Sequence, residues 1–286
     1  MKSLSSPPGD APGALFVVAT PLGNLEDLSP RALAVLRSVA TICAEDTRHT
    51  RILCAHWGID TPLLALHEHN ERARSESLLA RLTGGESLAL VSDAGTPLIS
   101  DPGYRLVRGA RAAHIPVYAV AGPSAVAAAL SVAGIPCDRF AFEGFPPAHQ
   151  AARRAFYAAL AAEPRTLVFY ESPHRLRASL EDLCATFGEA RPAALLRELT
   201  KRFEDGRLGT LADLARAVQA HTVKGECVLV VQGAPAPADD GEAERVLRLL
   251  LKTLPVRQAV DLAVAITHAP RKQLYQQALA WKDSGS

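Results

Sequence analysis

Four turns rich in small residues, each directly after an apolar run, are the places where this sequence could do chemistry. They are Ala19–Asn24, Glu45–His49, Ser92–Gly103 and Ala121–Ser124, and they include the carboxylates of Asp46, Asp93 and Asp101. Small residues let backbone N–H groups approach a ligand closely. Any one turn could simply reverse the chain, but four of them with acidic residues predict a ligand site.

The elements expected to position these turns alternate between strands and helices. The apolar runs expected to be buried strands are Ala14–Ala19, Thr41–Ala44, Leu63–Leu66, Ser87–Val91 and Val117–Val120. Helical patterns separate them, beginning with Ser29-Pro30, an N-cap followed by a proline in the first helical turn. This alternation predicts an α/β fold with a largely parallel sheet. Ligands bind outside the carboxyl ends of such strands, so the four turns share one edge.

The same rhythm continues in the second half, which reads as another α/β unit. Strands are expected near Phe140 and over Thr166–Tyr170, Ala193–Leu196 and Glu226–Val231. Two polar segments, Phe169–Arg175 and Arg197–Glu204, follow strands and are expected to face the cleft. The alternating charge of the latter is also typical of a solvated helix face.

Composition shifts predict the domain boundaries. We expect a flexible N-terminus over 1–12, an N-terminal α/β domain over 13–122, a C-terminal α/β domain over 123–233, a Pro/Ala-rich linker over 234–241 and a helical module over 242–286.

Charge and cysteine content exclude several protein classes. The 31 Lys and Arg nearly balance the 30 Asp and Glu, so any basic surface has to be local. The five cysteines form no C-x-x-C pair, which favours reduced thiols over zinc or disulfides. The N-terminus lacks the apolar core of a signal peptide, and no apolar stretch is long enough to span a bilayer, so a cytoplasmic location is expected.

Familiar catalytic signatures are missing from the sequence. It has no G-x-G-x-x-G, G-x-x-x-x-G-K, G-x-S-x-G or H-E-x-x-H motif. His67-Glu68-His69 has two histidines that could hold a metal, but this spacing after a strand is more typical of a solvated turn. We therefore expect no metal.

Six motifs occur in an order that resembles a known family. They are Thr20-Pro-Leu-Gly-Asn-Leu-Glu-Asp27, Glu45-Asp-Thr-Arg48, Ser92-Asp-Ala-Gly-Thr-Pro-Leu-Ile-Ser-Asp-Pro-Gly103, Gly122-Pro-Ser124, Tyr170-Glu-Ser-Pro-His-Arg175 and Arg197-Glu-Leu-Thr-Lys201. Together they resemble the ribosomal RNA small subunit methyltransferase I family, the 16S rRNA cytidine-2′-O-methyltransferases of the tetrapyrrole methylase-like superfamily. The resemblance runs from Leu15 to about Trp281. Thr20–Asn24 differs from the G-x-G-P-G-D of porphyrin methylases, which favours RNA as the substrate.

This resemblance implies two α/β domains with S-adenosylmethionine between them, in a homodimer that acts on 16S rRNA or the small ribosomal subunit. The carboxylate of Asp93 and nearby backbone amides are expected to hold the cofactor. The full set of expected cofactor-binding residues is Pro21, Leu22, Gly23, Asp93, Ala94, Gly95, Thr96, Pro123, Ser124, Phe169 and Tyr170.

Transfer to a ribose hydroxyl gains from a base or a nearby cation. The expected catalytic residues are Asp46 with Arg48 and Glu198 with Lys201. All four could instead form a salt-bridge network that closes the domain interface.

RNA contacts are expected from local basic groups, because the net charge is near zero. Arg257, Arg271 and Lys272 lie in the tail, where 7 Lys/Arg face 4 Asp/Glu over 241–286. These tail helices could also cap an apolar surface. Two other functions stay open: a small-molecule, tetrapyrrole-like methylase, and a non-catalytic RNA-binding assembly factor.

Overall fold

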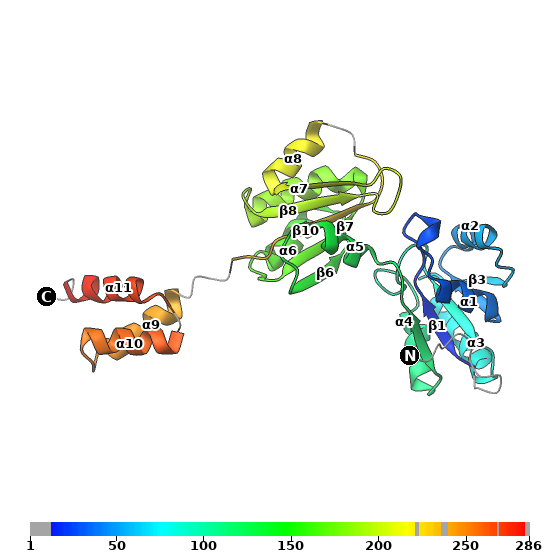
Figure 1. Cartoon of the computed structure of the whole chain (residues 1–286), viewed down its shortest axis with the longest axis horizontal. Coiled ribbons are helices and arrows are strands. Elements are labelled where there is room, and N and C mark those ends of the chain that lie inside the picture. Colours follow the sequence, from blue (N-terminus) through cyan, green and yellow to red (C-terminus); the bar gives the residue numbers. More distant parts are fainter. Residues whose placement is uncertain (1–12, 221–222, 236–239, 268, 284–286) are drawn as a thin grey trace. The chain divides into compact units, whose positions relative to one another are not determined.

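A computed structural model describes residues 13–220, 223–235, 240–267 and 269–283 (Figure 1). The predicted flexible N-terminus over 1–12 and residues 236–239 of the predicted linker lie outside these residues. The chain divides into two compact units. The first consists of the chain up to Ala161 together with Arg165–Gln232, and the second consists of Ala162–Pro164 and the chain from Gly233 onward. Both sheets belong to this first unit.

The first sheet is entirely parallel, as predicted. Its strands are β1 (Leu15–Val18), β2 (Thr41–Ala44), β3 (Leu63–Ala65), β4 (Leu88–Val91) and β5 (Val117–Val120). They lie in the order β3-β2-β4-β1-β5. Their carboxyl ends therefore meet at one edge, as the four turns require.

Helices cover both faces of this sheet, which explains why its strands are apolar throughout. They are α1 (Pro30–Ser38), α2 (Thr47–Trp57), α3 (Glu71–Thr83) and α4 (Tyr104–Ala112), with a short 3₁₀ helix η1 at Leu25–Asp27. Leu36 of α1 and Leu53 of α2 pack on one face, and Leu78 of α3 and Leu106 of α4 pack on the other.

The second sheet is mixed, unlike the first. Its strands are β6 (Phe140–Gly144), β7 (Thr166–Glu171), β8 (Pro192–Arg197), β9 (Asp205–Thr210) and β10 (Cys227–Val231). The order is β6-β7-β10-β8-β9, and only β6 and β7 are parallel. Strand β9 was not predicted, because its sequence DGRLGT is polar and carries two glycines.

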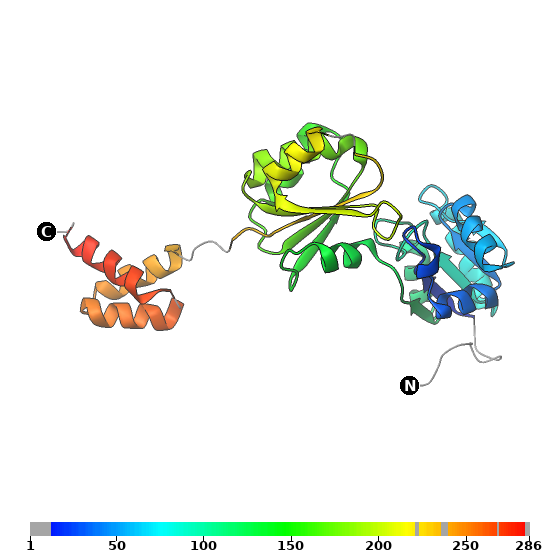
Figure 2. The ribbon, with the colours of Figure 1, turned by 45° about the horizontal axis from the view of Figure 1, so that its top comes forward.

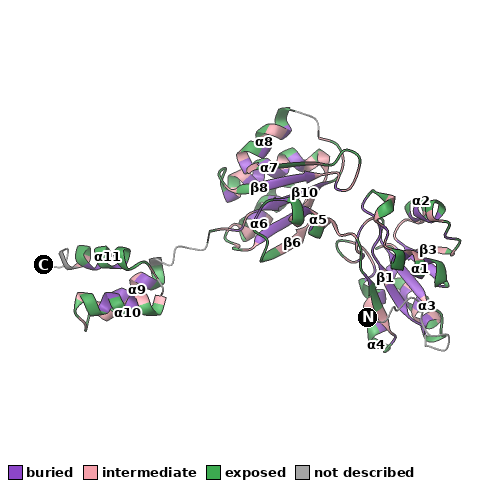
Figure 3. Cartoon of the chain, in the orientation of Figure 1, coloured by how far each residue is buried: buried purple, intermediate pink, exposed green. Residues whose placement is uncertain are grey.

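The faces of the second sheet differ in what covers them. Helices α6 (Gln150–Leu160), α7 (Pro173–Phe187) and α8 (Leu211–Ala220) pack on one face, and α5 (Ala125–Val132) packs on the other. Helix α8 was also not predicted. Figures 2 and 3 show these layers, with the buried strands between their helices. The short α5 leaves part of this face of the sheet available to line a site.

A buried ion pair joins α6 to α7. The Arg153 guanidinium lies 2.7 Å from Asp182, and the two side chains are 4% and 0% exposed. Arg154 also contacts Asp182, at 2.6 Å. The helices on this face of the second sheet are therefore joined by a buried ion pair, and each of its charges would be unfavourable without the other.

The second compact unit contains three helices with a core of their own. They are α9 (Asp240–Leu251), α10 (Val256–Thr267) and α11 (Arg271–Asp283). Leu247, Val260 and Leu274, one from each helix, are buried together. Within the part of the chain that the structure describes, no helix is long and apolar enough to cross a membrane.

Candidate active site

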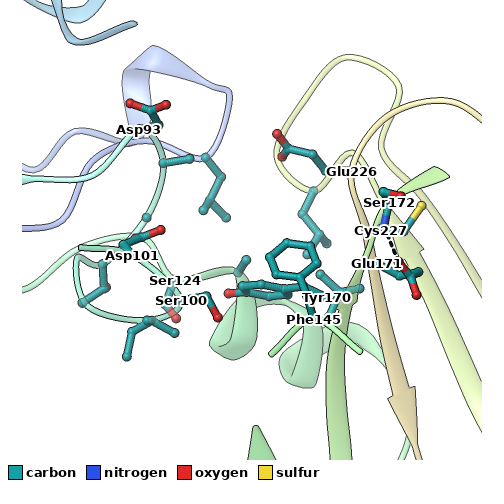
Figure 4. Close-up of a pocket in the computed structure, with 18 of the residues that line it drawn as sticks. Asp93, Ser100, Asp101, Ser124, Phe145, Tyr170, Glu171, Ser172, Glu226 and Cys227 are labelled. Atoms are coloured by element: carbon teal, nitrogen blue, oxygen red, sulfur yellow. Dashed lines mark hydrogen bonds between the residues drawn. The ribbon is translucent and has the colours of Figure 1, made fainter. Parts of the chain in front are cut away.

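A cavity of about 420 Å³ lies between the two sheets of the first unit. Its first wall comes from loops after β1, β2 and β4 and contains Leu22, Glu45, Asp93–Thr96 and Ile99–Asp101. Its second wall comes from the second sheet and contains Phe145, Tyr170–Pro173, Leu199 and Glu226–Val228. Ser124 and Ala125, where α5 begins, lie between the walls (Figure 4). The volume is within the range of roughly 300–1,000 Å³ of small-molecule sites.

Seven of the eleven predicted cofactor-binding residues line this cavity. They are Leu22, Asp93, Ala94, Gly95, Thr96, Ser124 and Tyr170. Pro21 and Gly23 instead line a neighbouring hollow of about 190 Å³. The carbonyl of Pro123 accepts a hydrogen bond from Thr96 Oγ1 at 3.0 Å, which ties two of the loops together.

Phe169 is placed away from the cavity. Side chains alternate along a strand, so Phe169 and Tyr170 of β7 point to opposite faces of the sheet. Tyr170 lines the cavity, whereas Phe169 is fully buried against α6 and α7. Its side chain therefore serves the core.

Gly95 forms a close turn in the first wall. Its φ is +81°, a conformation that side chains with a Cβ rarely adopt, and an added Cβ would lie 3.2 Å from the Leu22 side chain. Its N–H and C=O exchange hydrogen bonds of 3.0 and 2.8 Å with Thr20. Glycine is thus required here to hold two loops side by side at the cavity.

The carboxylate of Asp93 is already engaged within the protein. Its Oδ1 accepts the N–H of Asp46 at 3.0 Å, and its Oδ2 lies 2.9 Å from His49 Nδ1. The hydrogen bond to Asp93 raises the pKa of His49. Asp93 therefore joins the loop after β4 to the start of α2.

Asp46 and Arg48 do not line the cavity. Asp46 is the N-cap of α2 and accepts the Arg48 N–H at 2.8 Å, which is the usual role of Asp at this position. The Arg48 side chain pairs with the same carboxylate, and these hydrogen bonds lower the pKa of Asp46. The structure thus shows helix capping at this turn.

Glu198 and Lys201 also lie outside the cavity wall, in an ion-pair cluster at its border. Lys201 Nζ lies 3.0 Å from Glu198 and 3.1 Å from Glu226, which does line the cavity. Burial lowers the pKa of Lys201, but its hydrogen bonds to both glutamates outweigh burial and raise it. The methylenes of Lys201 fill the place that a Cβ on Gly23 would occupy. This cluster joins the second sheet to the first loop.

Asp101 was counted among the carboxylates of the four turns in the sequence but was not assigned to cofactor binding or catalysis. It lines the cavity and points into it (Figure 4). Burial raises the pKa of Asp101 to about 6, and nearby Glu45 and Asp93 contribute in the same direction against a hydrogen bond from Ser92. Glu45 also has a raised pKa, chiefly through burial.

Glu171 supplies a buried acceptor behind the second wall. Its Oε1 accepts from Ser172 N–H and pairs with Arg175, both at 2.8 Å. Its Oε2 is buried and has no hydrogen-bond partner within the described residues. Because side chains alternate along β7, Glu171 points to the same face as Phe169, so this oxygen lies in the core behind the second wall, on the side of α7.

Two aromatic rings complete the second wall, whereas the thiol of Cys227 belongs to the apolar core on the face of the sheet that packs against α6 and α7. The ring of Phe145, 54% exposed, stands 5.4 Å from that of Tyr170. Phe145 follows Gly144, whose φ is +66°, and a register shift in β6. Cys227 is buried, and this burial raises the pKa of its thiol to about 11.

The sequence also offered His67 and His69 as candidate metal ligands and the basic residues of the tail as candidate RNA contacts. His67 Nε2 lies 3.0 Å from the side-chain amide of Asn70, so the pair belongs to the turn before α3. In the helical module, Arg257 and Lys272 are exposed, whereas Arg271 pairs with Asp261 at 2.8 Å. Two of the three predicted RNA contacts are therefore unpaired among the described ionic contacts.

Comparison with known proteins links this chain to methyltransferases. Residues 14–215 match the family described as Tetrapyrrole (Corrin/Porphyrin) Methylases, and residues 237–282 match the RsmI C-terminal HTH domain. The chain is 58% identical over 268 residues to ribosomal RNA small subunit methyltransferase I of Xylella fastidiosa, covering 92% of this chain and 98% of that one.

Solved structures share the fold. Uroporphyrin-III-C-methyltransferase from Thermus thermophilus is similar with a TM-score of 0.56 and 25% identity, covering 77% of this chain and 94% of that one. A further structure of this enzyme, complexed with S-adenyl homocysteine, is similar with a TM-score of 0.54 and 17% identity, covering 77% and 97%.

Proposed function

Because the chain belongs to the ribosomal RNA small subunit methyltransferase I family of tetrapyrrole methylases, we propose that it methylates 16S rRNA with S-adenosylmethionine as the methyl donor. The acceptor that we propose is the 2′-hydroxyl of a cytidine in the decoding region of the small subunit. The observation that carries this proposal is the cavity between the sheets, which combines close-approaching backbone with an acidic lining.

The cavity residues fit S-adenosylmethionine. This cofactor supplies, when bound, a methyl group on a positively charged sulfonium. Glu45, Asp93 and Asp101 give the first wall a negative potential that suits a cation, and the positive φ of Gly95 lets backbone come close. Phe145 and Tyr170 present ring surface to a planar base.

Asp101 is the residue that we assign to proton transfer. A ribose hydroxyl must lose its proton as its oxygen bonds to the methyl carbon, and a carboxylate within reach can accept it. With a pKa of about 6, Asp101 is mostly ionised at neutral pH and is a stronger base than an ordinary carboxylate. The four catalytic residues expected from sequence lie outside the cavity, so we assign them to positioning.

Lys201 carries the clearest positioning role. Lys201→Ala removes the contact with Gly23 and the two ion pairs, so we expect weaker cofactor binding together with a lower kcat. Lys252→Ala, on the exposed end of the helical module, is the control. A fall in kcat of about 10²-fold with unchanged cofactor affinity would instead assign Lys201 to the chemical step.

The roles of the helical module and of a second copy of the chain are the remaining expectations. The separate core of the helical module supports a substrate-holding role for it, with Arg257 and Lys272 facing solvent. A truncation that ends at residue 235 is expected to keep cofactor binding and to lose rRNA affinity and its salt dependence. Light scattering of the full chain tests the expected homodimer. The proposed substrate places the reaction in the cytoplasm.

Transfer of labelled methyl groups to small ribosomal subunits that lack the modification tests the function. We expect label in 16S rRNA, and mass mapping of RNA from a deletion strain then identifies the nucleotide. A tetrapyrrole-like methylase would leave the RNA unlabelled, and a non-catalytic assembly factor would bind subunits without transferring label.

A further inference from the structure

Phe203 is the most exposed large apolar side chain in the described part of the protein, at 67%. It lies in the segment between β8 and β9, here called the Phe203 loop (residues 198–204). The Arg202 guanidinium lies 5.6 Å from the centre of its ring. Exposed aromatic rings beside arginine are the groups on which proteins stack the unpaired bases of single-stranded RNA.

Hydrogen bonds and strained backbone hold the Phe203 loop in one shape. Glu198 and Thr200 have φ values of +52° and +66°. The Thr200 N–H donates to Glu204 Oε2 at 2.7 Å, and the Glu204 N–H donates to the Lys201 carbonyl at 3.0 Å. A ring held in this way loses little conformational entropy when a base stacks on it.

The Phe203 loop is continuous with the active site. Leu199 lines the cavity, and Lys201 contacts Gly23 at its border. The same seven-residue segment therefore contributes to the cavity at one end and presents Phe203 to solvent at the other. An RNA strand whose ribose enters the cavity has to pass close to this loop.

A basic hollow of about 230 Å³ is lined in part by Asp205, which lies two residues after Phe203 in the chain. Three cations line it, Arg197, Arg207 and Lys224, with a single carboxylate, Asp205. That carboxylate lies 3.8 Å from Arg197 and 3.7 Å from Arg207, and no ion pair of Lys224 occurs among the described residues. The hollow thus has an excess of positive charge, which suits a phosphate of a nucleic-acid backbone.

We propose that the Phe203 loop and the basic hollow form a contact surface for single-stranded rRNA. Phe203 and Arg202 stack on an unpaired base near the target nucleotide, and Arg207 and Lys224 hold a backbone phosphate. This surface rests on the proposed function and adds a binding site on the first unit, separate from the helical module.

Stacking is tested with Phe203→Ala and Phe203→Trp in the full-length protein. The probes are a short single-stranded RNA containing the target cytidine and small subunits that lack the modification. Phe203→Ala is expected to weaken RNA binding about five- to 150-fold and to raise KM for the subunit, whereas Phe203→Trp keeps stacking and binds within a few-fold of wild type. The cofactor Kd should be the same in all three proteins, which shows that each is folded.

The phosphate contact is tested by salt dependence. The double variant Arg207→Gln/Lys224→Gln is expected to reduce the slope of log K against log salt by about 0.7 for each lost phosphate contact. Arg108→Gln, an exposed arginine of α4, is the control and should leave the slope unchanged.

Two results would overturn the inference in different ways. If Phe203→Ala keeps the RNA affinity of the wild type and Arg207→Gln/Lys224→Gln keeps its salt-dependence slope, the proposed contact surface is excluded and the proposed function stands. A wild-type protein that neither binds nor methylates the small subunit would remove both.

Discussion

The two walls of the cavity come from sheets of different topology. The first wall follows parallel strands, so every contributing loop leaves the sheet at its carboxyl edge. The second wall draws on a mixed sheet, where the end of β7 lies beside the start of its antiparallel neighbour β10. Tyr170 and Glu171 therefore end a strand, whereas Glu226 and Cys227 begin one. A rule based on strand ends locates the first wall and only part of the second.

The walls also differ in how their polar groups are held. Beside the first, His49 pairs with the wall residue Asp93, and their side chains are 63% and 33% exposed. Behind the second, Arg153 and Asp182 are almost fully buried. Exposed pairs contribute little to stability, whereas removal of one partner from a buried pair leaves an uncompensated charge. The first wall should therefore tolerate loss of an ion pair and the second should not.

The largest expected effect on stability is at Asp182. Asp182→Ala leaves Arg153 buried without its counter-ion, and we expect the free energy of unfolding to fall by about 3–5 kcal/mol in urea titrations. Glu181→Ala, which removes an exposed pair with Arg177 on the same helix, should cost about 0.5 kcal/mol or less. Equal losses in the two variants would contradict the contrast between buried and exposed ion pairs.

A second test concerns the chemistry of the first wall. Asp101→Asn keeps the size of the side chain but removes the base, so kcat should fall about 10²-fold or more. In the wild type, kcat should decrease as the pH falls through about 6, because protonated Asp101 cannot accept a proton. Measurement of kcat against pH checks both points, and a flat profile between pH 5 and 7 would assign the base elsewhere.

Gly95→Val tests the close turn of the first wall. The β-branched side chain disfavours a φ of +81° and meets Leu22, so cofactor binding should weaken by about 1–3 kcal/mol in calorimetry. Gly85→Val is the matched control, because Gly85 has a φ of +95° but no atom within 4 Å of an added Cβ. The control should lose stability and keep its cofactor affinity. Unchanged affinity in a folded Gly95→Val protein would remove this turn from the site.

The smallest effect is expected at His49. Its pKa is raised by Asp93, so the pair stabilises the fold when the imidazole is protonated. The difference in unfolding free energy between wild type and His49→Gln should be below about 1 kcal/mol. It should be largest below pH 6.5 and disappear as the pH rises through the raised pKa of His49. A difference that grows with pH would exclude this linkage.

Sequence reasoning reached most of the first wall because short apolar strands and small-residue turns are local signals. Leu22, Asp93, Ala94, Gly95 and Thr96 were all predicted and all line the cavity. In the second wall, Tyr170–Pro173 and Leu199 come from the two polar segments that were expected to face the cleft. The other residues of this wall depend on pairings between distant strands, which no local pattern reveals.

Phe145 and β9 show this limit. The positive φ of Gly144 and the register shift in β6 bring Phe145 to the cavity, and the sequence analysis assigned no role to this residue. Strand β9 is held by pairing with β8, since its own residues favour a loop.

Cys227 has a consequence for the chemical selectivity of the site. Its thiol lies in the apolar core that faces α6 and α7, so it points away from the proposed methyl donor, and a thiol attacks only as the thiolate. With a pKa of about 11, only about one molecule in 10⁴ carries this thiolate at pH 7. The position of Cys227 in the core and its protonated state thus both keep this thiol from competing with the substrate for the proposed methyl donor.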